Sequence, residues 1–86
     1  MNARQQRIIN DLREDSNLYL TRVIALPDYC TRLQDGIEEL ELEDKTLLRA
    51  LLDCWTTLEL IASTDSERQS LKEIATTIAG IRKLLA

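Results

Sequence analysis

The chain has 86 residues and a formal net charge of −4, with 44% hydrophobic and 30% charged residues. This length is typical of one small domain, and the apolar fraction is too high for an intrinsically disordered chain. Two glycines and one proline leave few residues for the turns of a many-stranded sheet, and the absence of phenylalanine leaves leucine and isoleucine to form the core. The sequence therefore predicts a single all-α domain over residues 1–86.

No stretch of the chain carries a catalytic signature. Histidine, the usual general base near neutral pH, is absent, and there is no Gly-rich phosphate loop. Cys30 and Cys54 are too few for a structural zinc site, and both occupy apolar positions of helical patterns. They are interpreted as reduced core thiols or, alternatively, as one disulfide. We expect no enzymatic activity, cofactor or metal.

The chain shows no targeting or membrane segment. Its N-terminal residues 1–15 lack the apolar region of a secretory signal. The most apolar stretch, Leu47–Ala62, is shorter than the roughly 20 residues needed to cross a bilayer and contains Arg49, Asp53 and Glu59. We expect a cytoplasmic protein that does not enter the membrane.

The first predicted helix runs from about residue 3 to 25. Its apolar seam has alternating spacings of three and four residues: Ile9, Leu12, Ser16, Tyr19, Val23 and Leu26. Pro27 disfavours helical backbone at the residue before it, which predicts a tight corner. The same spacing nevertheless continues through Cys30, Leu33, Ile37 and Leu40. One long kinked helix over residues 3–40, whose length a dimer would have to cover, is the alternative.

Three further helices are predicted after the proline. The second runs from Pro27 to about Leu40, where Gly36 costs roughly 1 kcal/mol relative to alanine and indicates close backbone contact or an early helix end. The third runs from about Glu43 to Ala62. The fourth follows a break at residues 63–66, where Thr64–Glu67 and Ser66–Gln69 have capping-box spacing. The sequence therefore predicts an antiparallel bundle of three or four helices.

The stretch Leu47–Ala62 contains the only tryptophan, Trp55. Its apolar residues cover more than half of the helix circumference, so we expect this helix to be the most buried. Leu52 and Leu60 fall in or beside its polar strip. They are therefore either exposed or covered by another chain, and are candidate partner-binding residues.

Residues 35–44 contain six acidic and no basic residues, whereas the remainder of the chain has 11 basic and 9 acidic residues. The segment is either a solubilising surface or a docking surface for a basic partner. The helix dipole favours anions at a helix start and disfavours them at a helix end, so local energetics explain only part of the cluster. The candidate partner-binding residues here are Glu38, Glu39, Glu41, Glu43 and Asp44.

These observations predict a small acidic protein–protein interaction module that acts by helix packing. An adaptor, a regulator or antagonist, and a chaperone of a helical client all fit, and we expect a homodimer. The first alternative is a dimeric nucleic-acid-associated transcriptional regulator that uses Arg4, Arg7, Arg82 and Lys83. Residues 70–81 look like the start of a helix-turn-helix unit, but only five residues follow, too few for a recognition helix. The second alternative is a structural subunit of a larger assembly.

Overall fold

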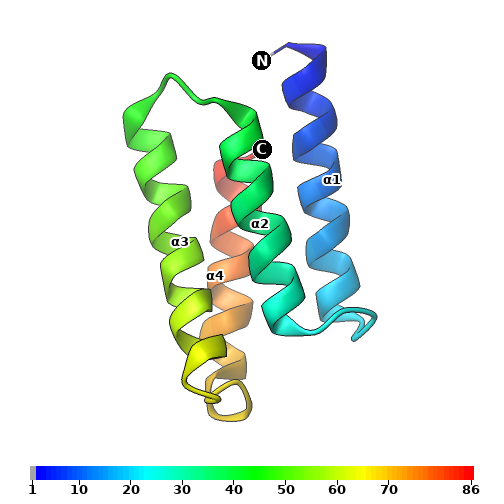
Figure 1. Ribbon diagram of the computed structural model, residues 1–86, viewed down its shortest axis with the longest axis vertical. Coiled ribbons are helices and arrows are strands. Elements are labelled where there is room, and N and C mark those ends of the chain that lie inside the picture. The colour runs from blue at the N-terminus through cyan, green and yellow to red at the C-terminus, as the bar shows by residue number, and fades with distance from the viewer. Residues whose placement is uncertain (1) are drawn as a thin grey trace.

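A computed structural model describes residues 2–86 as a bundle of four α-helices. The helices are α1 (Ala3–Leu20), α2 (Leu26–Leu40), α3 (Lys45–Ser63) and α4 (Leu71–Leu84), with a short 3-10 helix, η1 (Arg68–Ser70), before α4. Consecutive helices run in opposite directions, and α2 lies between α1 and α3 (Figure 1). The α1–α2 and α3–α4 connections lie at one end of the bundle, which we call the loop end (Figure 1). The predicted all-α bundle is confirmed.

The chain turns a corner before Pro27. Helix α1 ends at Leu20, five residues earlier than predicted, and Arg22 adopts a left-handed backbone with φ of 66°. Pro27 stands in the first turn of α2, where its missing amide hydrogen is not needed. The alternative of one long kinked helix over residues 3–40 is therefore wrong. A dimer is no longer needed to cover the length of such a helix. Because α1 stops early, Val23 leaves the apolar seam and is 67% exposed.

Helix α2, rather than α3, is the most buried element. Only three residues of α3 are buried: Leu51, Leu58 and Ile61. Seven residues of α2 are buried, namely Leu26, Tyr29, Cys30, Leu33, Gly36, Ile37 and Leu40. Trp55 is only partly buried, and its indole Nε1 donates a hydrogen bond of 3.0 Å to the carbonyl oxygen of Cys30. The prediction that the helix over Leu47–Ala62 is the most buried was therefore wrong. The apolar sector of α3 is wider than the surface that α2 and α4 cover.

Gly36 lets α1 approach α2 closely. A Cβ at this position would lie 2.9 Å from Cγ of Leu12, and nearer still to Cδ2 of the same side chain. Close backbone contact is therefore the confirmed interpretation of this glycine. Gly80 in α4 differs, because no atom that its Cβ would meet lies within 4 Å.

Local hydrogen bonds define the ends of the helices. Asn2 and Gln5 form a capping box at the start of α1, and Asp44 caps α3. The predicted break between the last two helices is present, at residues 64–67 rather than 63–66, but neither capping box predicted there forms. The hydroxyl of Thr64 donates instead to the carbonyl oxygen of Leu60, at the end of α3, and α4 begins without a side-chain cap. Cys30 and Cys54 are free thiols, so the alternative of a disulfide is wrong.

Candidate functional site

The two predicted contact residues of α3 are uncovered within one chain. Leu52 is 39% exposed and Leu60 is 62% exposed. They lie on either side of Thr56 on the outer side of the helix, where the neighbouring side chains are polar. They stay predicted partner-binding residues.

The five predicted acidic contact residues are also exposed, but they lie elsewhere. They belong to the end of α2 and to the α2–α3 turn, at the opposite end of the bundle from the loop end (Figure 1): Glu38, Glu39, Glu41, Glu43 and Asp44. Two of them have local roles. Asp44 accepts hydrogen bonds from the amides of Thr46 and Leu47, and Glu41 forms an exposed ion pair of 3.8 Å with Arg4. The structure therefore does not join the acidic segment with Leu60, which lies near the loop end of α3.

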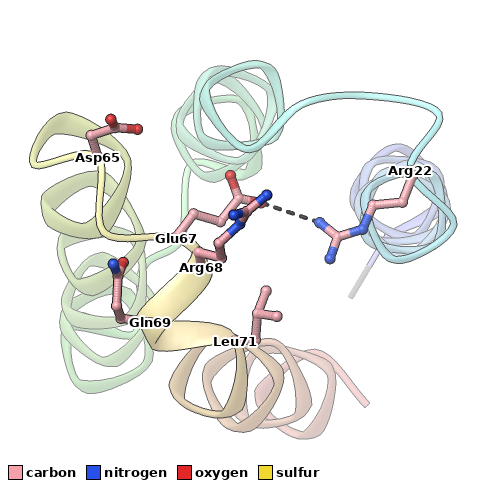
Figure 2. Close-up of a pocket in the computed structure, with 6 residues that line it drawn as sticks. All are labelled: Arg22, Asp65, Glu67, Arg68, Gln69 and Leu71. Carbon is pink, nitrogen blue, oxygen red and sulfur yellow. Dashed lines mark hydrogen bonds and ion pairs between the residues drawn. The ribbon is translucent and has the colours of Figure 1, made fainter.

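A surface that the sequence did not predict lies at the loop end. A hollow of about 620 Å³ opens there between the two connections (Figure 2). A second one of about 150 Å³ continues between α1 and α4. Arg22 and Leu71 line both hollows, which makes them one continuous surface. We call this surface the loop-end groove. Its other lining residues are Tyr19, Leu20, Asp65, Glu67, Arg68, Gln69, Ile74 and Ala75.

Glu67 ties the two sides of the loop-end groove together. Its Oε2 accepts a hydrogen bond of 2.7 Å from the hydroxyl of Tyr19 and one of 3.2 Å from Nη1 of Arg22 (Figure 2). The guanidinium of Arg22 also lies 5.5 Å from the ring centre of Tyr19, which stacks on the ring of Tyr29. Burial and the hydrogen bond to Glu67 raise the pKa of Tyr19 to about 12, so its hydroxyl remains a donor at neutral pH. Tyr19, Arg22 and Glu67 therefore form a hydrogen-bonded polar side of the groove.

The part of the groove between α1 and α4 is apolar. Leu20 of α1 and Leu71 of α4 line it and are 47% and 43% exposed. Tyr19 and Ile74, which also line it, are almost fully buried, so they form its floor. Exposed Val23 lies in the adjacent α1–α2 connection. Within residues 2–86, three of the five exposed large hydrophobic side chains thus line this part of the groove or belong to the α1–α2 connection beside it.

Beyond the groove, polar side chains join α1 to α4. Nε and Nη2 of Arg82 donate hydrogen bonds of 3.1 and 3.0 Å to the hydroxyl of Ser16, the polar residue in the predicted seam. Arg4 pairs with Glu41 instead. Because Ser16 stands 12 residues after Arg4, these arginines lie about 18 Å apart along α1. The four basic residues predicted for a nucleic-acid surface, Arg4, Arg7, Arg82 and Lys83, therefore do not form one cluster.

Opposite charges occupy opposite corners of the bundle. Helix α2 and the turn after it carry the acidic segment, whereas η1 and α4 contain four basic residues against one acidic residue, Glu73. The view along the bundle in Figure 2 places α2 and α4 diagonally across from each other. In the described chain, the ion pairs are Arg4–Glu41, Arg22–Glu67 and Arg32–Asp15. Arg68, which lines the groove, and Lys72 and Lys83 of α4 form no ion pair within the described residues.

Neither thiol is fully exposed, because Cys30 is buried and Cys54 is partly buried. Burial raises the pKa of the Cys30 thiol to about 11, which keeps it in the weakly nucleophilic protonated form. Over residues 2–86, no group of three or more cysteine or carboxylate side chains is arranged to hold a metal ion. No helix in the same range has the length and apolar character to cross a membrane.

No protein-family model, curated protein or solved structure matches this chain.

Proposed function

We propose that this protein is a protein–protein interaction module that binds another protein through the loop-end groove. The observation that carries the proposal is the pair Leu20 and Leu71, which line one groove above an apolar floor and are left about half exposed. Clustered exposed apolar side chains with a polar rim are typical of protein-binding surfaces, whereas single exposed leucines are common and need no explanation. Leu52 and Leu60 on α3, which line neither hollow of the groove, are therefore the second candidate surface.

Binding in a preformed groove is a mechanism that an adaptor, a regulator or antagonist, and a chaperone of a helical client can share. It requires no catalytic group. It requires a preformed surface, and the hydrogen bond from the buried Tyr19 to Glu67 supports one. The predicted homodimer, if formed through this surface, would place a second copy of the chain there instead of another protein, and the test below distinguishes the two.

The test is quantitative recovery of partners from the native host, with the native mass of the complex measured alongside. Tagged wild type is compared with Leu71→Lys in the groove and Leu60→Lys on α3. Both positions are exposed, so both variants should fold, which circular dichroism checks. We expect wild type and Leu60→Lys to recover the same partner and Leu71→Lys to recover at least tenfold less.

Three results would contradict this. Loss of the partner in Leu60→Lys alone would move the interface to α3. A complex whose mass is a multiple of the chain mass, with no other polypeptide, would make the protein a homo-oligomer. A monomeric mass with no partner would end the proposal.

A further inference from the structure

We propose that two copies of this chain associate through the outer face of α3, as an antiparallel pair of helices related by a two-fold axis. This inference goes beyond the proposed function, because no residue of α3 lines either hollow of the loop-end groove. The outer face of α3 consists of six exposed residues: Arg49, Leu52, Asp53, Thr56, Glu59 and Leu60. Its apolar surface, the positions of its leucines and the order of its charges each support a second copy as the occupant.

The bundle leaves apolar surface of α3 uncovered. Leu52 and Leu60 are exposed. Leu48 lies four residues before Leu52 and Trp55 three residues after it, so both are its neighbours on the helix surface, and both are only partly buried. Leu52 is therefore the outer edge of a continuous apolar strip rather than a single exposed leucine. A second helix laid along α3 would cover this strip.

The two leucines are placed symmetrically about Thr56. Each lies four residues from it, or about 6 Å along the helix axis, so the three side chains form one row. Rows of this spacing interdigitate in the commonest class of helix packing, in which the axes cross at about 50°. In an antiparallel pair centred on Thr56, Leu52 of each copy meets Leu60 of the other, and the same contact forms twice, as a two-fold interface requires.

The order of charges along α3 favours this antiparallel direction. Before Thr56, Lys45 and Arg49 outnumber Asp53, whereas Glu59 is the only charged residue of the helix after it. None of these four charged residues takes part in an ion pair within residues 2–86. In the antiparallel pair, Arg49 of one copy lies four residues, or about 6 Å along the axis, from Glu59 of the other. A parallel pair would instead place like charges opposite each other, which disfavours it.

The contact is limited in length. Glu43 and Asp44, just before α3, lie 12 or more residues from Thr56, or at least about 18 Å along the axis, where crossed helices have diverged. One pair of helices buries less than the about 800 Å² per partner of a stable complex. We therefore expect a dimer that dissociates on dilution. Each copy keeps its groove open, and the two grooves lie at opposite ends of the dimer, so the dimer would bridge two partner molecules if the proposed function holds.

Sedimentation equilibrium of the intact protein between about 5 and 500 µM measures the dimer, for which we expect a dissociation constant of about 10–100 µM. Leu60→Ser should weaken association at least tenfold, whereas the matched control Leu71→Ser, at an exposed leucine in the groove, should dimerise as wild type does. Arg49→Glu should weaken it at least threefold at low salt. Adding Glu59→Arg to Arg49→Glu restores opposite charges across the pair and should restore the dimer. Circular dichroism checks that each variant folds.

A protein that stays monomeric up to about 500 µM would overturn the inference. A dimer that weakens in Leu71→Ser, or that is unchanged in Leu60→Ser, would also overturn it. Failure of the double charge variant to restore the dimer would overturn the antiparallel arrangement.

The proposed function is decided separately, because contacts through α3 join two copies of the same polypeptide and contacts through the groove join the chain to another one. A monomer that still recovers its partner through Leu71 loses only the dimer. A dimer that recovers no partner from the native host loses only the function of the groove.

Discussion

Replacing Gly36 by alanine tests the packing of α1 against α2 in a way that a second glycine can calibrate. The added methyl group would lie 2.9 Å from Cγ of Leu12, whose side chain is 4% exposed and has little room to move. Overpacking of this kind costs about 1–3 kcal/mol. Alanine in place of glycine inside a helix stabilises by about 1 kcal/mol, which offsets part of that cost.

Gly80→Ala is the matched control, because its methyl group would meet no atom within 4 Å. It should raise the free energy of unfolding by about 0.5–1 kcal/mol. The overpacking cost is then the difference between the free energies of unfolding of the two variants. Gly36→Ala should be less stable than Gly80→Ala by about 1–3 kcal/mol. Urea unfolding followed by circular dichroism measures this difference. Equal stability, or a more stable Gly36→Ala, would refute the close contact of α1 with α2.

Three further predictions concern buried polar groups. Urea unfolding should show Tyr29→Phe to be as stable as wild type or up to about 1 kcal/mol more stable, because the buried hydroxyl of Tyr29 has no hydrogen-bond partner. Tyr19→Phe should instead lose about 1–2 kcal/mol, because it removes the hydrogen bond to the carboxylate of Glu67. Ser16→Ala should lose about 1–3 kcal/mol by the same assay, because Nε of Arg82 loses its acceptor and only Nη2 keeps one, Oδ1 of Asn17; an unchanged midpoint would contradict this. The pKa of Cys30 is raised from 9.0 to about 11, so its contribution to stability is present below pH 9 and lost as pH rises to 11. Cys30→Ala should flatten the fall of the urea midpoint between pH 9 and 11.

The helices could be predicted from the sequence because their signals are local. Apolar residues with alternating spacings of three and four produced all four helices, and the break at residues 63–66 separated the last two. The corner before Pro27 was harder. The seam spacing continues across the proline, and only the left-handed backbone at Arg22 shows that α1 has already ended. The spacing of apolar residues does not indicate that the chain changes direction at this position.

Burial and the groove could not be predicted in the same way. The periodicity of Leu47–Ala62 shows how much apolar surface α3 has, but not how much of it its neighbours cover, and Trp55 is accordingly only partly buried. Leu20 and Leu71 come together although they are 51 positions apart in the chain. One signal was available, since Leu20 follows Tyr19 and so lies off the centre of the seam of α1. Nothing in either local pattern indicates that these two leucines line the same groove.

Site-specific photo-crosslinking in the native host tests the central claim, that the loop-end groove is the protein-binding surface. A benzophenone amino acid is placed at Ala75 in the groove, at Leu60 on the outer side of α3, and at exposed Thr31 on α2. The groove position should crosslink to one other polypeptide upon irradiation, and the α3 and α2 positions should not. Crosslinks from Leu60 or Thr31, with none from Ala75, would contradict the claim.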